Sequence, residues 1–185
     1  AGKGGLVFRS FDGGATWGSY GLDTTTLRAV ATRGSNVWLA GNAGVLHRST
    51  DNGDTWATQT INGGLAVRAL SFPDAMHGWG AGDNGSIAVT TDGGVSWSAQ
   101  TSGTGNHLTA VWSEGPLTAY VAGKSGTLLK TVNGGASWNS IAGAGWTADL
   151  MGVSGRGNTL YVTGSEGFCR KSSDGGLTWQ ALSFR

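Results

Sequence analysis

The 185-residue chain has few of the residues that cross-link a fold or give a surface a strong charge. Its single cysteine, Cys169, excludes an intramolecular disulfide and does not indicate a redox compartment. Twelve basic residues against eleven acidic ones leave a formal charge of +1, too little to hold a nucleic acid or an anionic membrane surface. The sequence therefore predicts no nucleic-acid partner.

Long apolar runs and prolines are also scarce. No stretch approaches the roughly 18 consecutive apolar residues of a membrane span, so we expect no transmembrane segment. Residues 1 to 5 show neither a signal-peptide core nor an initiator methionine, which is typical of a processed or excised chain. Two prolines beside 35 glycines and nine tryptophans, with no sustained helical periodicity, predict short strands joined by tight turns.

One eight-residue pattern occurs five times: Ser/Thr, any, Asp/Asn, any, Gly, any, Ser/Thr, Trp. Its third residue can accept bonds from backbone N–H groups, its glycine admits positive φ, and its tryptophan can pack the turn onto the core. Because one copy has asparagine in place of aspartate, we interpret these boxes as structural turns between two strands. Their defining residues are Ser10, Asp12 and Trp17; Ser49, Asp51 and Trp56; Thr90, Asp92 and Trp97; Thr131, Asn133 and Trp138; and Ser172, Asp174 and Trp179.

The boxes start 39, 41, 41 and 41 residues apart, a period that in a strand-rich chain indicates propeller blades. An aromatic residue and a Gly-x-x-Gly turn keep the same register, so each repeat divides into four strands, here called A to D. We predict an all-β fold: a β-propeller of about five blades with antiparallel sheets and a box at each C–D turn. Four blades would be complete and the first incomplete.

We expect residues 1 to 185 to form a single propeller domain. Its blades would cover residues 1 to 20 (partial), 26 to 60, 66 to 101, 107 to 141 and 149 to 185. Since the first blade would hold only strands C and D, the edge from Leu6 to Phe11 would lack a neighbour in its own sheet. We expect self-association or missing N-terminal sequence to cover that edge.

The boxes resemble the Asp-box (BNR) repeats of sialidase-type propellers. The fuller pattern from Gly78 to Trp97 is similar to the repeats of photosystem II stability and assembly factors. Such repeats occur in hydrolases, receptors and assembly factors, so a photosynthetic role is one implication among several. Assembly factors of this type have more blades than the four full repeats and partial one here. The resemblance also implies a location outside the cytoplasm: secreted, periplasmic or lumenal.

In such a blade the B–C turns and D–A loops share one face, which we call the top face. The candidate contacts for a ligand lie on this face. They are arginines of strand A at the channel mouth, together with turn and loop residues. These residues are Arg28, Arg68, Asp83, Asn106, His107, Lys124 and Trp146. Trp146 lies outside the repeat register among small residues, where its ring could contact a ligand or anchor the loop.

These residues favour a non-catalytic binding or assembly module that holds a protein or peptide. One alternative is a lectin-like module that stacks sugars on Trp146, and another is a fragment of a sialidase-like or other glycoside hydrolase. A sialidase needs three arginines for the substrate carboxylate, and strand A offers only Arg28 and Arg68. No histidines have metal-ligand spacing, so we expect no metal and no cofactor.

Overall fold

The computed structural model describes residues 2–182, whose strands all belong to antiparallel sheets. The first sheet has two strands, β1 (Leu6–Arg9) and β2 (Gly18–Gly21). Four further sheets have four strands each, in chain order. They are β3 (Leu27–Arg33), β4 (Asn36–Gly41), β5 (Val45–Ser49) and β6 (Ala57–Thr60); β7 (Val67–Ser71), β8 (Gly78–Gly82), β9 (Ile87–Thr90) and β10 (Ser98–Gln100); β11 (Leu108–Ser113), β12 (Ala119–Gly123), β13 (Leu128–Thr131) and β14 (Asn139–Ser140); and β15 (Leu150–Arg156), β16 (Thr159–Gly164), β17 (Cys169–Ser172) and β18 (Gln180–Ala181).

The helical elements are single 3₁₀ turns, and none of the described ones has the length and apolarity needed to cross a membrane. They are η1 (Lys3–Gly5), η2 (Asn42–Gly44), η3 (Asn62–Gly64), η4 (Asp83–Gly85) and η5 (Ser165–Gly167).

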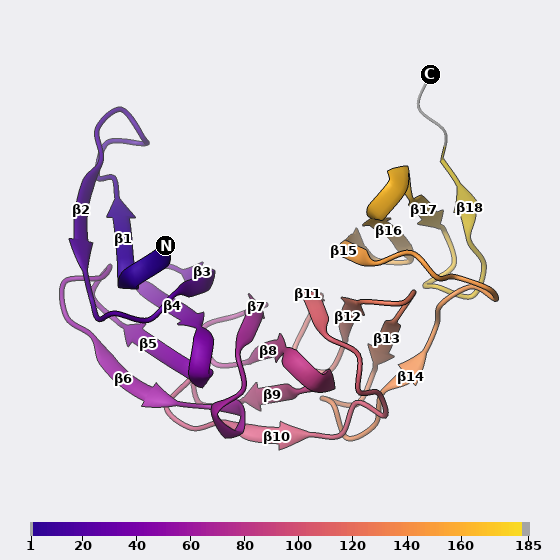
Figure 1. Cartoon of the computed structure of the whole chain (residues 1–185), viewed down its shortest axis with the longest axis horizontal. Coiled ribbons are helices and arrows are strands. Elements are labelled where there is room, and N and C mark those ends of the chain that lie inside the picture. The colour runs from indigo at the N-terminus through magenta and orange to yellow at the C-terminus, as the bar shows by residue number, and fades with distance from the viewer. Residues whose placement is uncertain (1, 183–185) are drawn as a thin grey trace.

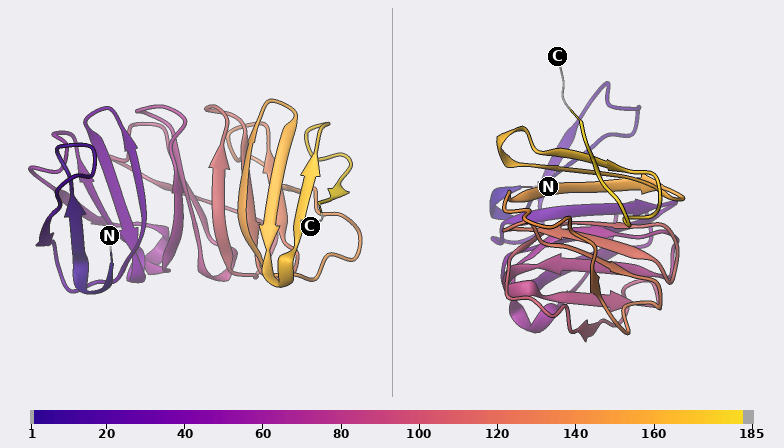
Figure 2. Two further views of the ribbon diagram at one scale, coloured as in Figure 1. Left: turned by 90° about the horizontal axis from the view of Figure 1, so that it is seen from above. Right: turned by 90° about the vertical axis from the view of Figure 1, so that its right-hand side faces the viewer.

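The sheets stand side by side as the blades of an arc (Figure 1). Strands β3, β7, β11 and β15 line its inner side, and β6, β10, β14 and β18 its outer rim. Blade 1 (β1–β2) and blade 5 (β15–β18) lie on either side of an opening, and Figure 2 shows the blades from two further directions. The predicted propeller, with four complete blades and a two-stranded first one, is confirmed.

The hydrophobic core is divided among the joints between blades. Trp38 and Trp79 are fully buried and Tyr120 nearly so, each from the second strand of its blade and each against the next blade. At the joint between blades 2 and 3, the Trp38 ring stacks on Phe72 with ring centroids 3.7 Å apart. Burying one such side chain contributes about 2 to 3 kcal/mol, so each blade depends on the neighbour that covers it.

Each box closes on itself through the same hydrogen bonds. In blade 3 the Thr90 hydroxyl donates to Asp92 and accepts from the Gly94 N–H, and Asp92 accepts from the Ser96 N–H and hydroxyl. These bonds lower the pKa of Asp92 to about 2, the Ser96 hydroxyl contributing most. Asn133 keeps the geometry by donating its own Nδ2–H to Ser137.

The fourth strand begins one residue after the box tryptophan, as β6 does at Ala57, because the tryptophan still belongs to the turn. The expected packing of the box tryptophans needs one correction. The box tryptophan of blade 1, Trp17, does not pack onto a core and is 63% exposed. Its counterpart Trp56 is half-buried against blade 1, whereas no described blade precedes Trp17.

Candidate binding face

The first strand of every complete blade carries a β-bulge near its top end. In blades 2 and 3 the register shifts between Leu27 and Ala29 and between Val67 and Ala69, so the extra residues are Arg28 and Arg68. A bulge leaves one residue out of the pairing and re-aims its side chain. The two arginines therefore leave the regular in-and-out alternation of the strand and meet the B–C turns of their own blades.

The turns that receive these arginines have a constrained backbone. Their third residue lies in the left-handed region, with φ of 53° at Ala43, 54° at Asn84, 53° at Ser125 and 56° at Glu166. Such a conformation costs a non-glycine residue about 1 kcal/mol or more, so packing must hold it in place. The glycine that follows allows the turn to approach the D–A loop: a Cβ on Gly126 would collide with the loop carbonyl of Trp146.

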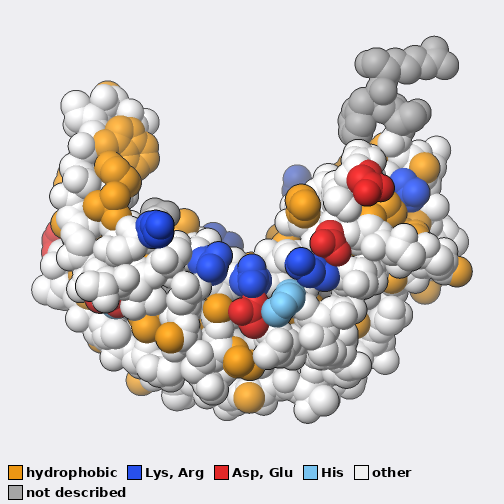
Figure 3. Space-filling view, in the orientation of Figure 1, with side chains coloured by type: hydrophobic (Ala, Val, Ile, Leu, Met, Phe, Trp, Pro, Cys, Tyr) orange, Lys and Arg blue, Asp and Glu red, His pale blue; other side chains and the backbone are white. Residues whose placement is uncertain are grey.

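Charged side chains and a histidine run along this face (Figure 3). Arg28 Nε donates to Asn42 Oδ1 over 2.6 Å, and Arg68 Nε donates to Asp83. The His107 ring, at the start of blade 4, lies 3.1 Å from the Asp83 carboxylate. Blades 2 to 4 thus share a row made of two arginines, the Asn42 amide, the Asp83 carboxylate and the His107 ring.

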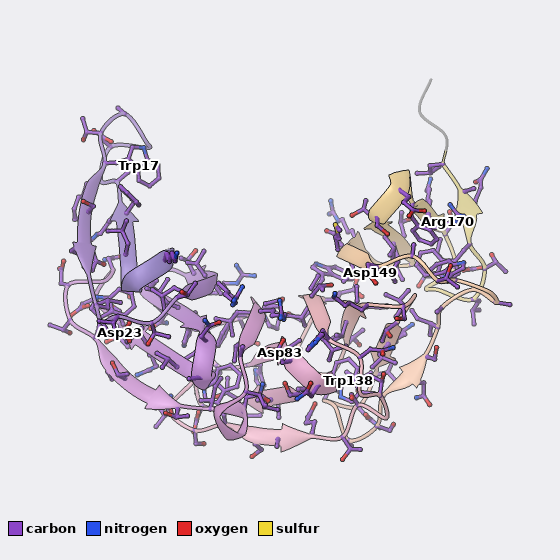
Figure 4. All side chains as sticks on the ribbon, viewed as in Figure 1. Trp17, Asp23, Asp83, Trp138, Asp149 and Arg170 are labelled. Atoms are coloured by element: carbon purple, nitrogen blue, oxygen red, sulfur yellow. The ribbon has the colours of Figure 1, made fainter. Side chains whose placement is uncertain are left out.

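A second pair continues the row toward blade 5. Lys124 Nζ is 3.8 Å from Asp149 Oδ2, and the Ser125 N–H donates to the other Asp149 oxygen over 3.0 Å. Asn106 ties its loop to the next turn, because its Nδ2–H donates to Thr127 Oγ1 over 2.9 Å. Asp23, Asp83 and Asp149 follow one another along the arc (Figure 4).

Asp83 is the best-paired carboxylate of the row. Burial opposes its ionisation, but the hydrogen bond and charge of Arg68, with the charges of His107 and Arg28, outweigh burial and keep the pKa of Asp83 below its usual value. Arg28 differs because its hydrogen-bond partner is a neutral amide. Among residues 2–182, no ion pair within 4 Å includes Arg28, whose side chain is exposed. Of the two bulge arginines, Arg28 is therefore the one available to an incoming carboxylate.

Trp146 occupies a different part of the top face. Its half-buried ring meets Phe168 and Trp179 edge-on, with centroids 4.9 and 5.3 Å away, so it anchors its loop to blade 5. It also lines an open recess of 870 Å³. The charged residues that line the recess are Asp149, Glu166 and Arg170. The Arg170 guanidinium lies 4.3 Å from the centre of the Phe168 ring. The row and the recess meet at Asp149, but Trp146 lies at the end of the face away from Arg28.

The other histidines are held by nearby groups. His47 is 2% exposed and lies between Thr58 Oγ1, at 2.8 Å, and Asp23 Oδ2, at 3.0 Å. His77 pairs with Asp74 at 2.9 Å within the same turn. No group of three potential metal ligands occurs among the described residues.

The sequence reasoning missed Asn42 as the partner of Arg28 and did not pair Asp149 with Lys124. A comparison of equivalent repeat positions could have found Asn42, since it corresponds to Asp83 and Lys124. The packing of Phe168 and Trp179 on Trp146 had no such signal, because loop lengths differ between repeats.

The sheets, their boxes and the arc they form define the class of the protein: an Asp-box β-propeller. A family model described as photosynthesis system II assembly factor YCF48 matches residues 59–184. The chain belongs to that family. No curated protein matches it in sequence.

Three solved structures are similar to the chain. YCF48 from Cyanidioschyzon merolae is 20% identical over 87% of this chain and 57% of its own, with a TM-score of 0.68. A structure described as YCF48 bound to D1 peptide is 17% identical over 97% of this chain and 75% of its own, with a TM-score of 0.49. A GH74 xyloglucanase from Xanthomonas campestris is 18% identical over 96% and 34%, with a TM-score of 0.72.

At these sequence identities, the similarity to the first and third structures shows a shared fold alone. The chain spans less than two thirds of the length of the YCF48 from Cyanidioschyzon merolae.

Proposed function

We propose that the chain is a non-catalytic assembly or binding module that holds a protein or peptide on its top face. The observation that carries this proposal is the pair of bulge arginines: Arg68 is neutralised by Asp83, while the hydrogen-bond partner of exposed Arg28 within residues 2–182 is a neutral amide. A guanidinium in this position suits a carboxylate, which it can bind through two parallel N–H donors. Membership of a family described as an assembly factor fits a polypeptide ligand.

The ligand class follows from the charge along the row. An extended peptide laid across it would meet a free cation at Arg28, a neutralised pair at Arg68 and Asp83, and a second pair at Lys124 and Asp149. We therefore propose that the peptide places an acidic side chain or its terminal carboxylate at Arg28. Asn106, His107 and Trp146 are proposed as further contacts.

Titration calorimetry with a library of acidic peptides, each tested with a free and an amidated C-terminus, tests this proposal. We expect Arg28→Gln to weaken the best binder about tenfold, as the loss of a charge-assisted bond does. The matched control is Arg33→Gln, an exposed arginine in the same strand whose guanidinium donates to the neighbouring Thr32 carbonyl. Equal weakening in both variants would contradict a top-face site.

A lectin-like module is the second candidate, because the recess beside Trp146 combines aromatic walls with two carboxylates and Arg170. A glycan array decides between the two proposals: saccharide binding that Trp146→Ala abolishes, without any acidic peptide binder, would favour the lectin. Hydrolysis of xyloglucan or an aryl glycoside would overturn the non-catalytic proposal and favour a glycosidase.

A further inference from the structure

One repeat position lies at the top of each joint between complete blades. It is the residue just before the first strand of a blade: Ala66 before β7, His107 before β11 and Asp149 before β15. Its carbonyl accepts the N–H of the first B–C turn residue of its own blade, at 3.0 Å in blade 3 and 2.8 Å in blades 4 and 5. The backbone therefore places this residue at the same point of each joint.

In two of these joints the side chain at this position accepts a hydrogen bond from the preceding blade. Asp149 accepts the N–H of Ser125, the second residue of the B–C turn of blade 4, over 3.0 Å. The equivalent N–H of blade 3, that of Asn84, donates to His107 Nδ1 over 3.4 Å. Asp149 also lies 3.8 Å from the ammonium of Lys124. The joint of blades 4 and 5 thus brings together a carboxylate, a cation and a turn N–H.

The joint of blades 2 and 3 has the same backbone but a different side chain. Ala66 stands where the other joints have an acceptor, and its methyl group cannot accept the N–H of Ala43, the residue equivalent to Ser125. Ala43 is exposed and has the same left-handed φ as Ser125, 53°. A Cβ on Gly44 would collide with the Ile61 carbonyl, so this turn also lies against the loop that leads to Ala66. The joint therefore offers a turn N–H that the side chain of its own loop does not use.

The same joint carries a cation. Arg28 is exposed and donates to Asn42, the first residue of this turn, while its charge also acts on the Asp83 carboxylate of blade 3. Its guanidinium therefore lies where blades 2 and 3 meet. Compared with the joint of blades 4 and 5, this joint has the cation and the turn N–H, and a carboxylate would complete the set.

We propose that a carboxylate of the ligand takes this place over Ala66, where it accepts the Ala43 N–H and pairs with Arg28. The inference rests on the proposed function and makes it more specific, because it names the joint and the backbone donor that recognise the acidic group. The ligand carboxylate would do at blades 2 and 3 what Asp149 does at blades 4 and 5. An aspartate side chain and a C-terminal carboxylate share this chemistry.

Nuclear magnetic resonance of the whole isotope-labelled protein tests this placement. The probe is the tripeptide Gly-Asp-Gly, acetylated and amidated so that the aspartate carries its only charge. At up to about 20 mM, the range in which one ion pair and one hydrogen bond become visible, it should shift the Ala43 amide resonance. The Ser125 amide, already bonded to Asp149, should not move, and the neutral probe Gly-Asn-Gly should shift neither. A response to acetylated Gly-Gly with a free C-terminus, and none to Gly-Asp-Gly, would assign the place to a terminal carboxylate.

Two variants exchange the roles of the joints. Ala66→Asp supplies the carboxylate from the chain itself, so it should shift the Ala43 amide without any peptide and weaken the response to Gly-Asp-Gly about tenfold or more. Asp149→Ala removes the acceptor from the joint of blades 4 and 5. The Ser125 amide should then respond to the same peptide.

An Ala43 amide that neither carboxylate probe moves, or that responds equally in wild type and in Ala66→Asp, would overturn the inference. The proposed function fails by a different result. An acidic library peptide whose binding depends on Arg28 but is unchanged in Ala66→Asp would keep the top-face site and reject this placement. An Ala43 response to the tripeptide without any library binder would support the carboxylate site and reject the peptide-holding function.

Discussion

The interior joints and the two ends of the arc use the same repeat but bury it differently. Tyr120 and Tyr161 hold equivalent positions in blades 4 and 5, each with a lysine ammonium 5.3 or 5.9 Å from its ring centre. Tyr120 is 2% exposed and Tyr161 is 43% exposed, because blade 5 covers the first and no described blade covers the second. How much the residue at a repeat position contributes to stability therefore depends on the blade that covers it, not on the repeat sequence itself.

The largest effect should come from removing the interior aromatic. Tyr120→Ala opens a cavity at a closed joint, and we expect the free energy of unfolding to fall by about 3 to 5 kcal/mol. Tyr161→Ala removes a ring that is partly in water already and should cost less than about 1 kcal/mol. Urea unfolding of both variants measures the difference; similar losses would show that the outer face of blade 5 is covered in solution.

Trp146 lies near the end of the arc but packs against other aromatic rings, as the interior residues do. Its contacts with Phe168 and Trp179 lead us to expect that Trp146→Ala lowers the free energy of unfolding by about 2 to 3 kcal/mol. The sequence alone, with small residues around Trp146, left open whether the ring contacts a ligand or anchors the loop. An unchanged melting temperature would contradict the role of a loop anchor.

Two interior tryptophans test whether packing or hydrogen bonding holds a joint. Trp38 donates its indole N–H to the Gly93 carbonyl over 2.8 Å, whereas the buried indole N–H of Trp79 has no partner among the described residues. Trp38→Phe should therefore cost about 1 to 2 kcal/mol more than Trp79→Phe, which also removes an unpaired buried donor. Thermal unfolding of the two variants gives the ranking, and a reversed order would refute this account.

The boxes should respond less than the joints because they are local. Asp92→Ala removes the acceptor of the Ser96 N–H and hydroxyl and should cost about 1 kcal/mol. Asp92→Asn should cost less than about 0.5 kcal/mol, because Asn133 makes the equivalent turn in blade 4. Equal damage from the two substitutions would show that the charge itself is required.

The smallest expected effect is the pH dependence of the contribution that Asp92 makes to the free energy of unfolding. The folded pKa of Asp92, about 2, lies below the usual value of 3.8, mainly through the Ser96 hydroxyl, so ionised Asp92 stabilises the fold. This contribution is fully present above pH 4 and is lost as the pH falls through 2. The difference in unfolding free energy between wild type and Asp92→Asn should shrink over that interval, by under about 0.5 kcal/mol because the group is exposed. A constant difference would contradict it.

The repeat determined most of the fold. Five boxes at steps near 41 residues, an aromatic residue at a fixed offset and a glycine turn define four strands per blade, because each signal concerns residues close together in sequence. The half blade at the start follows from the same alignment. Such local patterns can be read from one chain, since turns and hairpins depend on the residues that form them.

The tertiary structure alone decided what Arg28 and Arg68 face and how far Tyr161, Phe8 and Trp146 are buried. A bulge depends on how two strands pair, and exposure depends on which blade lies alongside. Both depend on contacts between residues distant in the chain, which no local pattern encodes.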